Sequence, residues 1–465
     1  MAHADPDRVV AVMGPHILTA DALERASNRY ARELLARGVH RNDLVTVSLP
    51  NGFEMLIVCV AIWKAGATPQ PVSRGLTPDE QRAVVATAHP ALTIGLAVDG
   101  VPVLTQGHAP GADLDDSTLP DAWARSWKAP TSSGSTGRPK VVVATAPALL
   151  DPDAPVAAFL PLRGTQLVSG PLTHSAPFTY AFRGLLTGHR LVLLPRFDEH
   201  AWLDAVERHR VTWSLVVPTM MHRLLRLPET ERGADRLESL ETLLHLGAPC
   251  PPELKRRFLA WVGADRVVEV YAGSESNGLT MIRGDEWLRR PGSVGRPIGG
   301  TQIRVQRADG TEAEPGEAGL VWMRRGDSST YRYLGAPTRR THDGWDTLGD
   351  VGHLDADGYL WITDRDDDVI IRGGEKVYPV EVERVLEQHP SVRSAVAFGV
   401  PDDVHGQRIE AVVDIGDADV DAETLRAFAA TVLDRPRRPA RVRIVREPVR
   451  DDAGKVRRRS FAGPR

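Results

Sequence analysis

The chain has 465 residues, of which 42% are hydrophobic and 25% are charged. These proportions are typical of globular proteins and exclude a disordered or fibrous chain. The length exceeds what one hydrophobic core normally serves, so we expect two or more domains. The formal net charge of −4 gives no reason to expect nucleic acid or an anionic membrane as a partner.

The cysteine usage and the first residues bear on the compartment. The chain has two cysteines, Cys59 and Cys250, and this pair encodes neither a disulfide framework nor a cysteine zinc site. The residues after Met1 lack the basic and apolar regions of a secretory signal. The most apolar run, 55–63, is about half the length of a membrane span. We therefore expect a cytoplasmic protein without a membrane span.

In chain order, the first elements alternate between helices and short apolar strands. Thr19 is placed to cap a helix that closes at Gly38. A strand is predicted over 44–49, followed by a buried helix through 56–63. Further apolar runs lie at 190–195 and 212–217. This alternation predicts parallel β-α-β units and an α/β fold for the larger part of the chain.

The pattern changes after residue 300. Short strands near 303–305 and 319–323 are separated by Asp-Gly turn signals, which predicts a small β-rich subregion. An acidic run, 363–368, precedes a helical pattern at 381–386 and a strand at 395–400. We predict a domain boundary near residue 365, with a large N-terminal α/β domain (1–365) and a small α+β C-terminal domain (366–465).

The segment Thr131-Ser-Ser-Gly-Ser-Thr-Gly-Arg-Pro-Lys140 carries the strongest local signal. Hydroxyl residues interleaved with glycine let amides and hydroxyls converge on a phosphate, and the lysine adds a positive charge. The spacing is not that of a Walker loop, because Val141 follows Lys140 where Ser or Thr is required. The segment is therefore a phosphate loop of another kind or an ordinary surface loop.

This segment resembles the signature loop of the adenylate-forming superfamily, which includes acyl- and aryl-coenzyme A synthetases, luciferases and peptide-synthetase adenylation domains. Further segments resemble motifs of that family in the same order along nearly the whole chain. They are Gly247-Ala-Pro249, Tyr271-Ala-Gly-Ser-Glu275, Thr347-Leu-Gly-Asp350, Asp364-Arg365 with Asp367, Ile370 to Pro379, and Ala453-Gly-Lys455.

The resemblance implies ATP, Mg²⁺ and coenzyme A as cofactors and assigns roles to residues in both domains. The β- and γ-phosphates would be held by Ser132, Ser133, Gly134, Ser135, Thr136, Gly137 and Lys140. The rest of the nucleotide would be contacted by Gly247, Ala248, Pro249, Tyr271, Ala272, Gly273, Ser274, Glu275, Asp350, Arg365 and Lys455. Tyr271 would stack on adenine, Asp350 and Arg365 would bind the ribose, and Glu275 would carry Mg²⁺.

Lys455 carries the catalytic role that the resemblance implies, together with Glu275. A mobile ammonium between the carboxylate and the α-phosphorus would stabilise the transition state more than the ground state. The C-terminal domain would be mobile, with Asp367 as hinge and with Gly373 and Gly374 lining the pantetheine path. The alternative for Lys455 is a surface lysine in a basic tail. The alternative for Gly373 and Gly374 is an ordinary hairpin turn.

The acid is expected to bind near His174, where the family has a gating aromatic or histidine, and near Gly247. The alternative for His174 is a structural loop histidine. Met220 and Met221 are compatible with a bulky apolar acid, aryl or polycyclic, although methionine is equally an ordinary core residue. The resemblance thus implies an AMP-forming acid–thiol ligase that passes the acyl group to coenzyme A.

Some positions depart from the family pattern. Val141 and Ala272 replace glycines and Ser274 replaces a threonine, while the segment before Lys455 lacks the usual Pro-Lys/Arg-Thr lead-in. Two other hypotheses stay open. One is a stand-alone enzyme that loads a carrier protein, and the other is a nucleotide-binding regulator without turnover.

Overall fold

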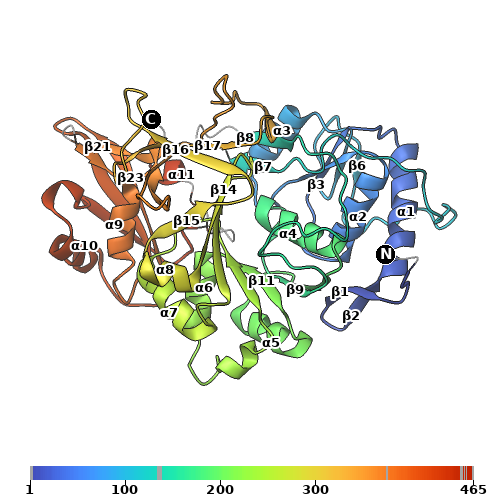
Figure 1. The fold of residues 1–465 in the computed structure, drawn as a ribbon, viewed down its shortest axis with the longest axis horizontal. Coiled ribbons are helices and arrows are strands. Elements are labelled where there is room, and N and C mark those ends of the chain that lie inside the picture. Colours follow the sequence, from blue (N-terminus) through green and yellow to red (C-terminus); the bar gives the residue numbers. More distant parts are fainter. Residues whose placement is uncertain are drawn as a thin grey trace.

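A computed structural model describes residues 4–133, 139–372, 375–450, 454, 456 and 458–462. The N-terminal helices lie at one end of the molecule and the C-terminal elements, orange and red in Figure 1, at the other. Among the described residues, no helix is long and apolar enough to span a bilayer.

A sheet of thirteen strands, counted over the described residues, forms the centre of the larger part of the molecule. Its parallel strands confirm the predicted α/β fold. In sheet order they are β1 (Val9–Met13), β10 (Arg190–Leu193), β9 (Thr165–Val168), β11 (Trp213–Val216), β12 (Thr242–His245) and β13 (Val267–Ala272), with β2 (His16–Thr19) at the edge. The helices that accompany them are α4 (Ser175–Leu186), α5 (Glu199–His209), α6 (Pro218–Arg226) and α7 (Pro252–Val262).

A second parallel sheet lies near the N-terminus. It has the order β4 (Thr68–Pro71), β3 (Leu44–Val47), β5 (Leu92–Ile94) and β6 (Val103–Leu104), with α1 (Ala20–Ala36), α2 (Phe53–Lys64) and α3 (Pro78–Ala88). Thr19 caps α1 as predicted, because its side chain accepts a hydrogen bond from the Ala22 amide. Every residue of α2 is buried or half-buried, which explains why its sequence is apolar on all sides.

The predicted β-rich subregion exists, but it continues the large sheet instead of standing apart from it. Its strands pair antiparallel with one another and join the parallel part through β13. They are β14 (Leu279–Arg283), β15 (Ser293–Pro297), β16 (Thr301–Gln306), β17 (Gly319–Arg325), β19 (Asp350–Leu354) and β20 (Leu360–Arg365), with the short helix α8 (Gly284–Arg289). One strand of this region, β18 (Tyr331–Leu334), instead pairs with β8 (Pro139–Ala144), which pairs with β7 (Thr131–Ser133).

The C-terminal domain has a hydrophobic core of its own, formed by residues between Ile370 and Val442. Its elements are β21 (Ile370–Arg372), β22 (Glu375–Val377), α9 (Pro379–Leu386), β23 (Ser394–Asp402), β24 (Gly406–Asp414), α10 (Ala422–Val432), β25 (Arg441–Val445) and α11 (Arg458–Ala462). A single 3₁₀ turn, Asp366–Asp368, connects β20 to this domain. The domain is thus a small α+β unit, as the sequence predicted.

Candidate active site

The predicted phosphate loop connects β7 and β8, which form an antiparallel hairpin. Ser132 and Ser133 pair in register with Lys140 and Pro139. Gly134, Ser135, Thr136 and Gly137 lie outside the described residues. Val141, where the family has glycine, is fully buried in a small core with Ala88, Ala129 and Val143, so its side chain serves packing.

Lys140 meets Glu275 and Tyr333 at the end of this hairpin. The Lys140 ammonium lies 3.2 Å from Glu275 Oε1 and 2.8 Å from the Tyr333 hydroxyl, and it lies over the Tyr333 ring at 4.0 Å. The Tyr333 hydroxyl donates to the same Glu275 oxygen at 2.6 Å. Burial alone would raise the pKa of Glu275, but the Lys140 charge and the Tyr333 hydroxyl hold it below its ordinary value. Glu275 is therefore a buried, ionised carboxylate.

Four residues before Glu275, Tyr271 marks the second part of the site. The Tyr271 hydroxyl, on β13, donates to Asp350 Oδ2 at the start of β19. Burial and the Asp350 carboxylate raise the pKa of Tyr271, so the hydroxyl stays protonated. Arg365 is paired with Asp350 in the β19–β20 ladder, and its Nε lies 3.4 Å from Asp350 Oδ1. The three residues that the sequence assigned to adenine and ribose therefore lie together.

The turn between Tyr271 and Glu275 needs a glycine at one position. A β-carbon on Gly273 would lie 2.8 Å from Glu275 Oε2 and 2.8 Å from Leu348, which is too close for a real side chain. Ala272 is exposed, so its methyl group, absent from the family's glycine, fits without a clash. Ser274 is half-buried in the same turn.

The predicted adenine loop, Gly247, Ala248 and Pro249, directly follows β12. Gly247 has a φ of 94°, a backbone conformation that favours glycine. The C-terminal tail reaches this loop. A β-carbon on Gly454 would lie 3.6 Å from the Ala248 β-carbon, 3.7 Å from Val217 and 3.8 Å from the Thr219 hydroxyl.

Two arginines anchor the tail on either side of the predicted catalytic lysine. The Arg450 guanidinium lies 3.1 Å from Glu383 Oε2, and that of Arg458 lies 2.8 Å from Glu383 Oε1. Glu383, on α9, is only 1% exposed, and Arg458 also pairs with Asp368 of the connecting turn at 2.8 Å. The predicted hinge residue Asp367 lies in that turn. Lys455, Gly373 and Gly374 lie outside the described residues.

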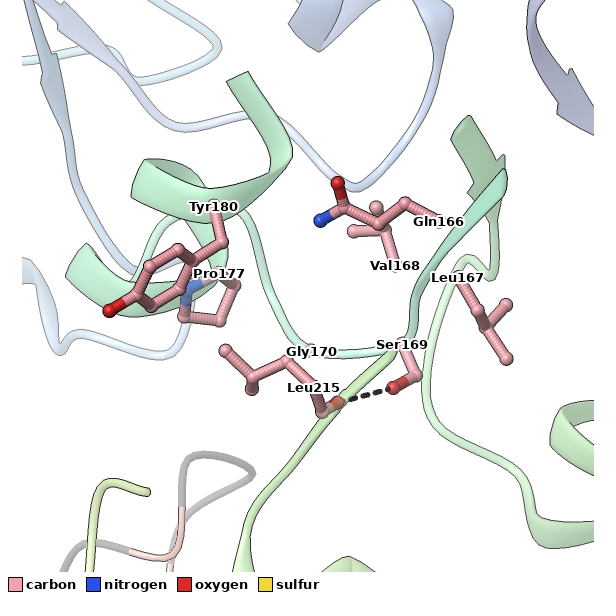
Figure 2. Close-up of a pocket in the computed structure, with 8 residues that line it drawn as sticks. All are labelled: Gln166, Leu167, Val168, Ser169, Gly170, Pro177, Tyr180 and Leu215. Atoms are coloured by element: carbon pink, nitrogen blue, oxygen red, sulfur yellow. Dashed lines mark hydrogen bonds between the residues drawn. The ribbon is translucent and has the colours of Figure 1, made fainter. Parts of the chain in front are cut away.

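His174 is the residue before the first turn of α4 and is half-buried. Next to it, a small pocket lies between α4 and the ends of β9 and β11. Figure 2 shows Pro177 and Tyr180 of α4 on one side of this pocket and the turn at Ser169 and Gly170 on the other. Behind Tyr180, the rings of Phe159 and Trp213 lie 5.7 Å and 5.9 Å from its ring centre. The pocket thus has an aromatic ring at Tyr180 and apolar side chains at Leu167, Val168 and Leu215, together with the polar Gln166 and Ser169.

The site offers one carboxylate that suits Mg²⁺. Across the described ranges, no group of three or more His, Cys, Asp or Glu side chains gathers as a metal cage. Mg²⁺ is usually held by one or two carboxylates together with substrate phosphates and water. Glu275, ionised and beside the phosphate loop, fits that requirement.

Comparison with known proteins agrees with this geometry. The family described as AMP-binding enzyme matches residues 1–334, and the family described as AMP-binding enzyme C-terminal domain matches residues 381–455. The chain belongs to the AMP-binding enzyme family. The second match ends at Lys455, the residue to which the sequence assigned catalysis.

The most similar relatives place the chain within this family. A feruloyl-CoA synthase from an Amycolatopsis species is 33% identical, and the match covers 93% of this chain and 91% of the relative. A sulfoacetate–CoA ligase from Cupriavidus necator is 32% identical, with 95% and 92% covered. The solved structure of the amide bond synthetase McbA from Marinactinospora thermotolerans is 27% identical, with a TM-score of 0.83 and 98% and 96% covered. This AMP-binding enzyme is thus a member of the AMP-forming acid–CoA ligases.

The site also contains a residue that sequence reasoning did not find. Tyr333 contacts both Lys140 and Glu275, yet it lies in the plain strand Tyr331-Arg-Tyr-Leu334, which resembles no binding motif. It becomes part of the site because β18 pairs with β8. The sequence held no signal for a contact between residues 193 positions apart.

Proposed function

We propose that this AMP-binding enzyme converts a bulky apolar carboxylic acid, aryl or polycyclic, into its coenzyme A thioester at the expense of ATP. The observation that carries the proposal is the meeting of Lys140 and Glu275 beside Tyr271 and Asp350. This set provides a cation and a metal-binding carboxylate for phosphates, next to a ring and a carboxylate suited to a nucleoside.

In the first step, a carboxylate oxygen of the acid attacks the α-phosphorus, and the bond to the bridging oxygen of the β-phosphate breaks. Pyrophosphate leaves with that electron pair, and acyl-AMP remains. Lys140 is placed to bind the β- and γ-phosphates together with Ser132, Ser133, Gly134, Ser135, Thr136 and Gly137. A charge-assisted hydrogen bond from Lys140 offsets the charge that builds up on the leaving group.

The adenosine part of ATP would be held by Tyr271 and Asp350, whose side chains are hydrogen-bonded to each other. Asp350 can accept hydrogen bonds from both ribose hydroxyls, Arg365 approaches the same carboxylate, and the Tyr271 ring offers a face for adenine. Gly247, Ala248 and Pro249 would cover the other side of the base. Ala272, Gly273 and Ser274 would approach the α-phosphate with backbone amides and the Ser274 hydroxyl.

Mg²⁺, held by Glu275, would neutralise charge on the triphosphate. Lys455 would bridge the acid and the α-phosphate. The neighbouring Gly454 lies against Ala248, within the proposed nucleotide site, and this contact supports the role.

In the second step, the thiolate of coenzyme A attacks the acyl carbonyl and AMP leaves with the electron pair of the broken carbon–oxygen bond. We propose that the C-terminal domain (366–465) turns about Asp367 between the two steps. Gly373 and Gly374, between β21 and β22, would then line the pantetheine path.

The proposed nature of the acid rests on the side chains near His174 and Gly247. Tyr180 and Leu215 line the small pocket beside α4, and the buried rings of Phe159 and Trp213 pack against Tyr180. Met220 and Met221 are both buried in a neighbouring hydrophobic core. Such surroundings favour an acid with an apolar or aryl body, and feruloyl-CoA synthase is among the similar enzymes.

The decisive experiment is pyrophosphate release by the purified chain with a panel of fatty, aryl and polycyclic acids, with coenzyme A, with a phosphopantetheinylated carrier protein, or with neither. Acid-dependent release with an acyl-coenzyme A product supports the proposal and identifies the acid. Transfer only to the carrier protein would establish the alternative acceptor. ATP binding without release for any acid would favour a nucleotide-binding regulator.

A further inference from the structure

Two hydrogen bonds and one ion pair connect three side chains from distant parts of the chain. Lys140 lies in β8, Glu275 follows β13 and Tyr333 lies in β18. The Tyr333 hydroxyl has one proton, which it donates to Glu275, and it accepts a hydrogen bond from Lys140. It therefore bridges the cation proposed for phosphates and the carboxylate proposed for the metal.

The two oxygens of Glu275 have different surroundings. Lys140 and Tyr333 both contact Oε1, at 3.2 Å and 2.6 Å. Oε2 faces the backbone at Gly273, where a β-carbon would lie 2.8 Å away. Glycine at 273 thus lets the backbone lie close to Oε2, whereas Oε1 is held by the side chains of Lys140 and Tyr333.

The backbone around Tyr333 also contacts the segments that carry Lys140 and Glu275. In the β8–β18 ladder Tyr333 pairs with Val142, two residues after Lys140. The Thr330 hydroxyl, just before this strand, donates to the backbone carbonyl of Glu275 at 2.9 Å. The position of Tyr333 relative to both partners is therefore set by strand pairing and by a hydrogen bond to the backbone.

We propose that Tyr333 is a positioning residue for Mg·ATP: its hydroxyl holds Oε1 of Glu275, so that the carboxylate would stay in place to bind Mg²⁺ through Oε2 while Lys140 binds the phosphates. A lysine has three N–H donors and can turn one toward phosphate while keeping Tyr333. The tyrosine hydroxyl then keeps the carboxylate in place without relying on the lysine. This inference rests on the proposed function and adds to it a residue in the metal's immediate support.

The test compares ATP binding by the full chain in excess Mg²⁺ and in EDTA, by isothermal titration calorimetry. Tyr333→Phe keeps the ring and its contact with the Lys140 charge but removes the hydroxyl. We expect it to weaken binding of Mg·ATP about tenfold, as expected for a hydrogen bond to a charged group. Binding of ATP in EDTA should stay within about twofold of the wild type.

Tyr331→Phe is the matched control. Tyr331 lies in the same strand with its ring 4.6 Å from that of Tyr333, but its hydroxyl donates to Asp346 at 2.7 Å. This variant should bind Mg·ATP and ATP in EDTA like the wild type. Electron paramagnetic resonance of Mn²⁺ with ATP should show weaker metal retention in Tyr333→Phe and wild-type retention in Tyr331→Phe.

A double-mutant cycle with Glu275→Gln guards against a general loss of structure. If Tyr333 acts through the Glu275 carboxylate, Tyr333→Phe should have little further effect on Mg·ATP binding in the Glu275→Gln background. The inference is wrong if Tyr333→Phe binds Mg·ATP like the wild type, if it weakens ATP equally with and without metal, or if the two effects add fully. A wild-type chain that does not bind ATP would instead overturn the proposed function.

Discussion

Gly454 lies directly against Ala248, although the two residues belong to different domains. A β-carbon on Gly454 would lie 3.6 Å from that of Ala248, and the φ of Gly454 is 73°, a conformation that favours glycine. The tail that contains Lys455 therefore reaches the proposed nucleotide loop in this arrangement of the domains.

Replacing Lys455 by alanine should slow acid-dependent pyrophosphate release roughly 10²–10³-fold, the effect of deleting one preorganised donor in an active site. The reason is that its ammonium would stabilise charge between the acid and the α-phosphate. Thioester formation from supplied acyl-AMP and coenzyme A should change little, and this reaction is the control. Unimpaired pyrophosphate release would identify Lys455 as a surface lysine.

Removing Glu383 should loosen the tail. Arg450 and Arg458 both pair with this carboxylate, which is 1% exposed. Glu383→Ala removes the carboxylate that pairs with both guanidinium groups. Breaking a buried ion pair by removing one partner lowers the free energy of unfolding by about 3 kcal/mol or more. Hydrogen exchange should show earlier opening of α9 and the tail, and adenylation should slow.

Glu423→Gln is a suitable control for Glu383→Ala, because Glu423 forms an exposed pair with Arg426 in the same domain. Its effect on stability should stay within about 0.5 kcal/mol. Equal behaviour of the two variants would show that the arginine anchors do not hold the tail.

Replacing Asp350 by alanine should raise the KM for ATP by about tenfold or more, because both ribose hydroxyls would lose their acceptor. The KM for the acid should change much less. Steady-state kinetics with each substrate varied separately measures the two values. Asp357→Asn, which alters an exposed pair with Arg290, should leave both unchanged. A larger effect of Asp350→Ala on the acid than on ATP would contradict the ribose assignment.

Lys128 should make stability depend on pH. Burial lowers its pKa to about 7, from an ordinary value of 10.5. Its ammonium contacts the hydroxyls of Ser175 and Thr179. Between these pH values the unfolded chain holds a proton that the folded chain has lost, so this lysine makes the free energy of unfolding rise with pH.

Lys128→Met removes this titration and the cost of burying the charge. We expect the variant to be more stable than the wild type at pH 7, by about 1 kcal/mol or more, with the difference shrinking toward pH 9. Chemical denaturation across this pH range measures both effects. A variant that is less stable throughout would mean that the contacts with the α4 hydroxyls outweigh the cost of burial.

The sequence by itself determined the features that depend on neighbouring residues. The cap at Thr19 and the alternation of apolar strands and helices gave the α/β fold, because local hydrogen bonding and burial produce these patterns. The motifs around Lys140, Glu275 and Asp350 could be recognised in the sequence because each is a short run of consecutive residues whose side chains suit phosphate, metal or ribose binding.

Only the tertiary structure decided the contacts between distant segments. Tyr333 contacts Lys140 because β18 pairs with β8. The helix predicted from residue 381 begins at Pro379, because Asp364 Oδ2 accepts a hydrogen bond from the Val380 amide at its first turn. The pairing of β18 with β8 and the hydrogen bond from the Val380 amide to Asp364 both form between segments that are brought together only by tertiary folding. Hydrophobic periodicity and local motifs record which face of an element is buried, but not which distant side chain meets it.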